Sequence, residues 1–358
     1  MKELHTLTRY DTSAPATALL DGTIVDANRD LYWIDTPEGV LLCTLRGRLR
    51  KQLFYPISAN LRHKARRVGV KAHDPVSVGD RVRVLPAGGG KGVIEEILPR
   101  ESGAFTREDA GIGHVTSVAG IDQMALVFAV REPTPHLGLL DRFLVLAEAQ
   151  ELACVIVLNK LDLGLDPALD RRLGVYRALG YAIVPTSVET GEGLDTLRSR
   201  LGGHTSALLG PSGVGKSSLL NALEPGLSLK VSAISRSTGK GRHTTSNTRL
   251  VALAGSGGGY LADTAGIRAL ALGNAAVGRL DWCFREFRPH LGGCFHSDCT
   301  HRHEPGCTVR AAVAAGALDQ ERYDSYCRLF DDGAEAGGRA WKDLVGSRSL
   351  SADGELRL

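Results

Sequence analysis

Hydrophobic and polar residues alternate in the early part of the chain, and turn residues interrupt the alternation repeatedly. The segments LLDGTIVDA, LYWIDTPEGVLLCTL, VGDRVRVLP and KGVIEEILP show this pattern between residues 16 and 100. A period of two places every second side chain on one face of a strand. About five strands in about 85 residues are typical of a small closed barrel, so we expect a β-barrel domain over residues 16–102.

A different pattern begins near Gly120, where nearly continuous apolar runs alternate with amphipathic segments. These are QMALVFAV, LLDRFLVLAEAQEL, ACVIVLNK, LDRRLGVYRALG, YAIVPTS and HTSALLG, followed by RLVALAG and GGYLADTAG. Apolar strands separated by helices predict a parallel sheet that helices cover on both faces. We therefore place an α/β domain at 119–274. The aperiodic, Gly- and Ser-containing stretch before it is predicted to be a linker at 103–118.

The end of the chain combines a Cys/His cluster with two helical stretches, VRAAVAAGAL and ERYDSYCRLFDD. It predicts a mainly helical domain at 275–345 and a poorly ordered tail at 346–358. No run approaches the ~18 apolar residues that span a bilayer, and the N-terminus has no apolar stretch of signal-peptide length. We expect a soluble, cytoplasmic monomer with no membrane partner.

The sequence GPSGVGKSS fits the phosphate-binding pattern G-x-x-x-x-G-K-[ST]. An apolar strand, SALL, precedes it and a helix-compatible segment, SSLLNALE, continues it, as this motif requires. Glycines let backbone N–H groups turn toward phosphates, Lys216 reaches the β- and γ-phosphates, and Ser217 ligates Mg²⁺. The predicted loop consists of Gly210, Pro211, Ser212, Gly213, Val214, Gly215, Lys216, Ser217 and Ser218.

A second motif, N-K-x-D, ends an apolar strand upstream of this loop. A carboxylate at Asp162 accepts hydrogen bonds from N1–H and the exocyclic amine of guanine, whereas N1 of adenine is itself an acceptor. The motif therefore selects GTP over ATP. Ser187 and Val188 follow the next strand and are placed to support the base, although a simple strand-end turn would look the same. The base motif consists of Asn159, Lys160, Leu161 and Asp162.

Two further segments complete a GTPase set. In DTAG, Asp263 would hold Mg²⁺ through a water and the Gly266 amide would sense the γ-phosphate. The polar segment SRSTGKGRHTTSNTRL suits a switch in which either Thr244 or Thr245 closes on Mg²⁺. Relative to an ordinary GTPase, the motifs stand in the order four, five, one, two, three. This order is a circular permutation, which a fold tolerates when its natural termini lie close together.

Hydrolysis needs a group that orients the attacking water, and many GTPases use a Gln immediately after D-x-x-G. Here that position is Ile267, whose apolar side chain cannot do this. His243, in the GRHTT segment, is the best polar candidate for a catalytic role. The alternative is that His243 packs or contacts RNA.

Charge is unevenly distributed although the net charge is only +3. The segment from residue 46 to 71 contains nine Lys or Arg and no Asp or Glu. Such a density of like charge marks a candidate nucleic-acid surface, with a solvated loop as the alternative. The candidates are Arg46, Arg48, Arg50, Lys51, Arg62, Lys64, Arg66, Arg67 and Lys71.

Three of the seven cysteines gather near a histidine in the pattern C-x₄-C-x-H-x₅-C. Three thiolates and one imidazole form a closed tetrahedral set, which is typical of a structural Zn²⁺ site. A metal site in a reducing compartment suits this crowding better than a disulfide framework. The predicted ligands are Cys294, Cys299, His301 and Cys307.

Taken together, these motifs resemble the bacterial small-ribosomal-subunit-dependent GTPases, the RsgA/YjeQ family, over nearly the whole chain. The resemblance implies an OB-fold barrel, a circularly permuted P-loop GTPase domain and a C-terminal domain with one structural Zn²⁺. It implies a Mg²⁺- and GTP-dependent hydrolase that binds the 30S subunit and its 16S rRNA, assists late maturation, is stimulated by the subunit and leaves after hydrolysis. It also supports His243 as the catalytic residue and the basic segment as an rRNA contact.

Two features depart from the family pattern: Ala265 replaces a usual Pro, and residues 52–71 resemble an additional basic loop. A non-catalytic, GTP-sensing rRNA-binding adaptor is the alternative function, because the usual Gln is missing. Phosphate release with and without 30S subunits discriminates between the two. An ATP-dependent kinase or ATPase is disfavoured by Asp162 and by the lack of an acceptor-substrate motif.

Overall fold

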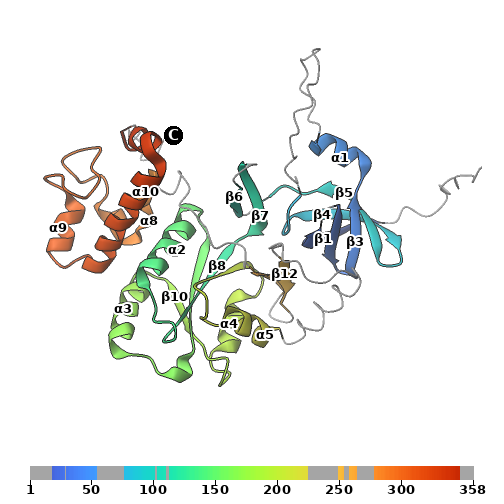
Figure 1. Cartoon of the computed structure of the whole chain (residues 1–358), viewed down its shortest axis with the longest axis horizontal. Coiled ribbons are helices and arrows are strands. Elements are labelled where there is room, and N and C mark those ends of the chain that lie inside the picture. The colour runs from blue at the N-terminus through green and yellow to red at the C-terminus, as the bar shows by residue number, and fades with distance from the viewer. Residues whose placement is uncertain are drawn as a thin grey trace, which may run out of the picture.

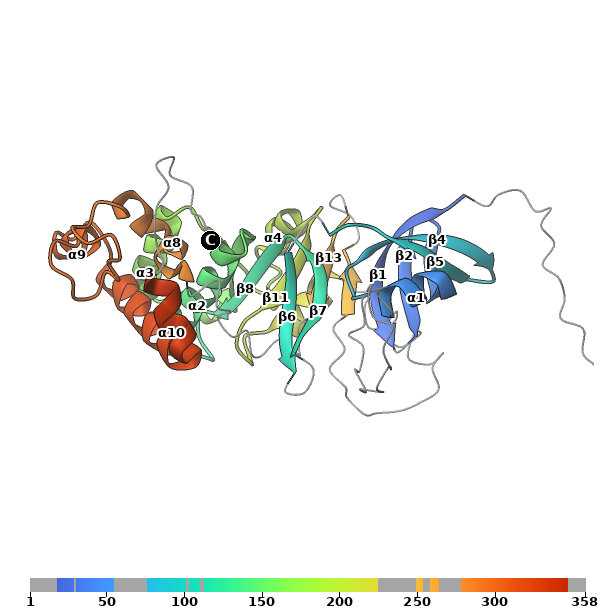
Figure 2. The same ribbon diagram turned by 90° about the horizontal axis from the view of Figure 1, so that it is seen from above.

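Three structural units follow one another along the molecule: a barrel, an α/β unit and a helical unit (Figures 1 and 2). The computed structural model describes residues 18–28, 30–54, 76–100, 103–109, 113–224, 249–253, 258–263 and 278–346. Within these ranges no helix has the length and apolar character needed to cross a membrane.

The first unit is a closed five-stranded barrel with the strand order β1-β2-β3-β5-β4. β3 and β5 are parallel, whereas the other pairs are antiparallel. Alternation puts Ile24, Tyr32, Ile34 and Ile94 inside, so the predicted barrel is confirmed and fits an OB-fold. Its elements are β1 (Leu20–Asn28), β2 (Leu31–Thr36), β3 (Gly39–Leu45), α1 (Gly47–Phe54), β4 (Arg81–Gly88) and β5 (Lys91–Ile97).

The connection to the second unit is a β-hairpin rather than the irregular linker expected at 103–118. β6 (Gly103–Asp109) and β7 (Gly113–Ile121) form a two-stranded antiparallel sheet. Its register shifts on both sides of Phe105. Such shifts interrupt the regular two-residue alternation, which explains why the sequence pattern did not reveal the strands.

The second unit is a six-stranded sheet with the order β10-β9-β8-β11-β13-β12. All pairs are parallel except β12 with β13. Separate apolar clusters cover its two faces, as the alternating pattern predicts. The strands are β8 (Gln123–Ala129), β9 (Ala153–Asn159), β10 (Ala182–Pro185), β11 (Thr205–Leu209), β12 (Arg249–Ala252) and β13 (Tyr260–Asp263); the helices are α2 (Leu137–Ala149), η1 (Leu161–Leu163), α3 (Pro167–Ala178), α4 (Leu194–Leu201) and α5 (Lys216–Leu223).

The third unit is mainly helical and packs on α2, which contributes Val145 to its core. Phe284, Phe287 and Tyr326 form an aromatic cluster with ring centroids 5.0–5.5 Å apart. The fold class predicted for the C-terminal part is confirmed. Its elements are α8 (Leu280–Cys283), η2 (Arg285–His290), α9 (Thr308–Ala314) and α10 (Gln320–Gly346).

Candidate nucleotide site and metal cluster

The predicted phosphate loop connects β11 to α5 at the carboxyl edge of the sheet. Gly210 has φ 148°, and a Cβ there would lie 2.1 Å from the Val127 carbonyl oxygen. Gly215 has φ 95°, and a Cβ there would lie 2.4 Å from Nδ2 of Asn159. Both positions therefore require glycine, because neighbouring strands press directly against the loop.

Lys216 extends back over the loop that precedes it. Its Nζ donates hydrogen bonds to the carbonyl oxygens of Gly210, at 2.9 Å, and Pro211, at 2.7 Å. The ammonium thus lies within the loop, where phosphate oxygens would meet it. Val214 is buried, while Ser212, Gly213, Ser217 and Ser218 are exposed.

Asn159 joins the base motif to both neighbouring motifs. It is 2% exposed, and its Nδ2 donates to the Val214 carbonyl oxygen in the phosphate loop at 2.8 Å. Its Oδ1 accepts a hydrogen bond from Oγ1 of Thr186 at 3.2 Å. These two bonds hold the side chain in place, so its contribution is to fix the motifs relative to one another.

The supporting turn holds the rest of the base motif. The Leu161 amide donates to the Thr186 carbonyl oxygen at 3.0 Å, and Oγ of Ser187 donates to Oδ1 of Asp162 at 2.5 Å. Asp162 is exposed at the edge of the sheet, whereas Val188 packs against the apolar cluster beneath. The carboxylate is therefore oriented while remaining open to a ligand.

The loop after β8 also borders this site, although the sequence did not indicate it. Nζ of Lys160 donates to the carbonyl oxygen of Glu132. Among the described residues, the nearest atom to a Cβ built on Gly213 is Cδ of Pro133, at 3.8 Å. The segment VREPTPH matches no nucleotide motif, and only the parallel order of β9, β8 and β11 brings it here.

Asp263 is the last residue of β13 and pairs with Leu208 of β11 and Arg249 of β12. This register places it beside the strand that enters the phosphate loop. The other predicted switch residues, His243, Thr244, Thr245 and Gly266, lie outside the described residues.

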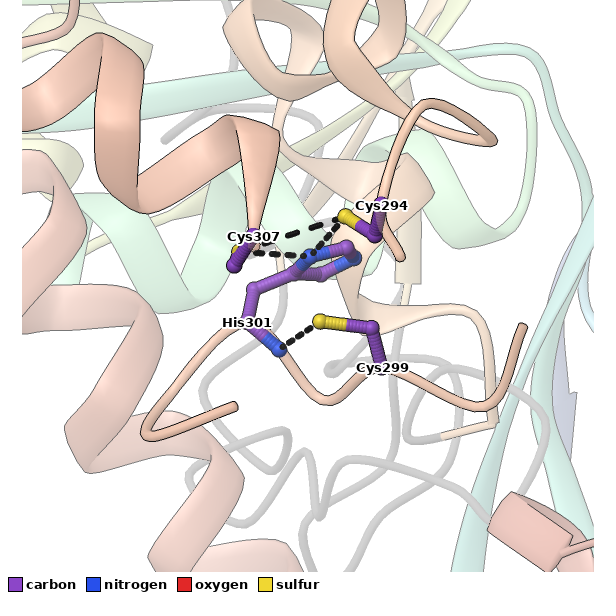
Figure 3. Close-up of side chains that lie close together, drawn as sticks. All are labelled: Cys294, Cys299, His301 and Cys307. Carbon is purple, nitrogen blue, oxygen red and sulfur yellow. Dashed lines mark hydrogen bonds between the residues drawn. The ribbon is translucent and has the colours of Figure 1, made fainter. Parts of the chain in front are cut away.

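The four predicted metal ligands converge at the end of the helical unit (Figure 3). Their ligand atoms all lie within 4.8 Å of one another. Nδ1 of His301 is 3.5 Å from Sγ of Cys294 and 3.4 Å from Sγ of Cys307. A tetrahedral zinc site has ligand–ligand edges of about 3.5–3.8 Å, so this donor set fits Zn²⁺. None of the seven cysteines, all of them among the described residues, forms a disulfide.

Two carboxylates that the sequence did not single out support the cluster. Asp281, on α8, lies 3.6 Å from Nε2 of His301, which leaves Nδ1 directed at the sulfurs. Glu304 accepts hydrogen bonds from the Thr300 amide at 3.0 Å and the Arg302 amide at 3.1 Å, which fixes the loop between the ligands. Burial raises the pKa of Cys294, but hydrogen bonds with Thr308 and the charge of His301 outweigh it and lower the pKa to about 7.

The basic candidates of the barrel are only partly described. Arg46 pairs with Glu95, and Arg50 pairs with Asp30 at 2.9 Å. Arg48 and Lys51 lie on the same helix, α1. Two of these cations are thus already shared with carboxylates of the barrel. Arg62, Lys64, Arg66, Arg67 and Lys71 lie outside the described residues.

Solved structures with the same architecture include YjeQ from Thermotoga maritima, with a TM-score of 0.63, 33% identity and coverage of 92% of this chain and 100% of that one. YloQ, described as a circularly permuted GTPase, gives a TM-score of 0.66, 27% identity and coverage of 92% and 99%. The parallel sheet, the phosphate loop and the upstream base motif accordingly define the class: a circularly permuted P-loop GTPase.

A family model described as RsgA GTPase matches residues 97–273. A protein of Gemmatimonas aurantiaca named small ribosomal subunit biogenesis GTPase RsgA is 40% identical, covering 88% of this chain and 98% of that one. The protein of the same name from Moorella thermoacetica is 38% identical, with 86% and 95% covered. The chain belongs to the RsgA GTPase family and is a GTP hydrolase.

Proposed function

We propose that this GTP hydrolase acts in the cytoplasm, as a monomer, on the small ribosomal subunit. It binds the 30S particle through 16S rRNA, assists late maturation and leaves after hydrolysis. The names of relatives aligned over nearly their full length support this role. The observation that carries the GTP chemistry is Asn159, which joins the base motif to the phosphate loop.

The proposed roles follow from the position of each residue. Asp162 recognises guanine, assisted by Ser187 and Val188, because its carboxylate accepts from two adjacent donors of that base. The phosphate-loop amides and Lys216 bind the β- and γ-phosphates. Ser217, Asp263 and either Thr244 or Thr245 would hold the Mg²⁺ that accompanies GTP, and the Gly266 amide would sense the γ-phosphate.

His243 is proposed to orient the attacking water, since Ile267 leaves the usual position apolar. The barrel and its basic helix are proposed to contact rRNA through Arg46, Arg48, Arg50 and Lys51. The segment carrying Arg62, Lys64, Arg66, Arg67 and Lys71 is proposed to extend that contact. Each phosphate neutralised in this way releases counterions, so binding should weaken with salt.

The helical unit is proposed to hold one structural Zn²⁺ through Cys294, Cys299, His301 and Cys307. Such an ion would supply folding free energy to the loop that carries these residues. Asp281 orients the imidazole, and Glu304 holds the intervening turn through backbone amides.

The test is phosphate release from GTP with and without purified 30S subunits. The unsubstituted protein should hydrolyse GTP slowly alone and faster with subunits. His243→Ala should retain GTP affinity and 30S binding but lose most of the stimulated rate, because general positioning of a water contributes on the order of 10²-fold. Full stimulation in this variant would assign the role to another group, and no stimulation of the unsubstituted protein would refute the ribosomal role.

A further inference from the structure

The antiparallel pair β12–β13 is bound to the barrel at two points. Arg249, the first residue of β12, donates from Nη2 to Oδ2 of Asp26 on β1. Tyr260, the first residue of β13, donates from its hydroxyl to Oδ2 of Asp35 on β2 at 2.9 Å. Burial and the charge of Asp35 raise the pKa of Tyr260 to about 12, so this donor keeps its proton at neutral pH.

The strand register connects these two contacts to the nucleotide site. Arg249 is the cross-strand partner of Asp263, and Ala252 is the partner of Tyr260. Asp263 also pairs with Leu208, two residues before the phosphate loop begins at Gly210. The barrel therefore holds the residue directly opposite the proposed Mg²⁺ carboxylate.

β12 depends on this support because it is the edge strand of the sheet. Among the described strands its only hydrogen-bonded neighbour in the sheet is β13, and β1 of the barrel packs beside it (Figure 1). Barrel residues Val25 and Trp33 share one apolar cluster with Leu250 of β12. Asp26 is only 5% exposed, so its carboxylate is shielded from competing water, while the Arg249 side chain is 30% exposed.

We infer that Asp26 is a positioning residue for GTP hydrolysis, which acts from the barrel by holding Arg249 and thereby the end of β13 where Asp263 lies. The inference rests on the proposed role of Asp263 as a Mg²⁺ ligand. Rates depend on such placement, since small displacements of a ligand weaken its bond to the metal ion. Loss of the contact should therefore lower the apparent affinity for Mg²⁺ during hydrolysis and leave the binding of guanine unchanged.

The experiment measures intrinsic GTP hydrolysis by the full chain, without ribosomes, across a Mg²⁺ titration. Asp26→Asn should raise the Mg²⁺ concentration for half-maximal rate about three- to tenfold, the range expected when a charge-assisted hydrogen bond is weakened to a neutral one. Saturating Mg²⁺ should restore the rate, and the KM for GTP should then equal that of the unsubstituted protein. Arg249→Met should also raise the Mg²⁺ midpoint. The double variant should have a midpoint no higher than that of the more impaired single variant, because both substitutions remove the same contact.

Asp21→Asn is the control, because Asp21 also lies on β1 but forms an exposed pair with Arg83 of β4, within the barrel domain. It should leave the Mg²⁺ midpoint unchanged. Tyr260→Phe is a milder variant that keeps the apolar contacts and should shift the midpoint in the same direction. A reduced rate at every Mg²⁺ concentration with an unchanged midpoint would show a merely structural role and overturn the inference.

Asp263→Asn separates this inference from the proposed function. If Asp263→Asn raises the midpoint and Asp26→Asn does not, Asp26 has no positioning role. If Asp263→Asn leaves the midpoint unchanged, Asp263 is not a Mg²⁺ ligand and both the assignment and the inference fall.

Discussion

Replacing Arg322 by methionine should loosen the helical unit from the GTPase unit by about 3–5 kcal/mol. Arg322, on α10, is 3% exposed. It donates to Asp141 of α2 at 2.6 Å and to both oxygens of Glu286 at 2.7 and 3.1 Å. Methionine keeps part of the alkyl packing but leaves Asp141, itself 2% exposed, and Glu286 as buried charges without their cation. Tyr176 still donates to Asp141 at 2.7 Å, which offsets part of the loss.

The assay is hydrogen exchange of the α2 and α10 amides, with the barrel strands as an internal reference. A loss of 3–5 kcal/mol corresponds to exchange faster by on the order of 10²–10⁴-fold when exchange reports opening free energy. Arg172→Met is the matched control at the same interface, because Arg172 pairs with Glu321 while the two side chains are 48% and 59% exposed. This exposed pair should contribute about 0–1 kcal/mol.

A compensated variant tests the reasoning further. Combining Arg322→Met with Asp141→Asn and Glu286→Gln removes both uncompensated charges and should recover most of the lost protection. If Arg322→Met alone changes exchange no more than Arg172→Met, the buried network does not hold the two units together, and the electrostatic argument is refuted.

Two other predictions concern the base and metal sites. Asp162→Asn should reduce the preference for GTP over ATP by about 10- to 100-fold, because one charge-assisted acceptor contact is lost. Asp166→Asn, at the N-cap of α3, is the control. An unchanged GTP-to-ATP ratio for Asp162→Asn in competition binding would contradict the guanine assignment. Elemental analysis should find one zinc per chain. Cys307→Ala should lose the zinc and expose residues 294–307 to protease, whereas Cys327→Ala, outside the cluster, should keep the zinc and a protease-resistant loop. Zinc-free protein with a protected loop would refute the metal site.

Local sequence patterns predicted the architecture, because the spacing of apolar side chains and the backbone needs of short motifs depend on residues close together in the chain. Period-two alternation identified the barrel, and apolar runs between amphipathic segments identified a parallel sheet with two covered faces. Motif order revealed the circular permutation, since each nucleotide motif is a short segment with its own backbone requirement, such as glycine at Gly210 and Gly215. The cysteine and histidine spacing likewise indicated a cluster that the fold brings together.

Tertiary structure alone decided the contacts between residues far apart in the chain. Asp26 and Arg249 are separated by 223 positions, and Asp141 and Arg322 by 181. Neither pair has a local pattern, because an acidic residue on one element and a basic residue on another become partners only when packing excludes water between them. The loop at Glu132 lies beside the nucleotide site because the order of strands in the sheet, and not their order in the chain, decides which loops are neighbours.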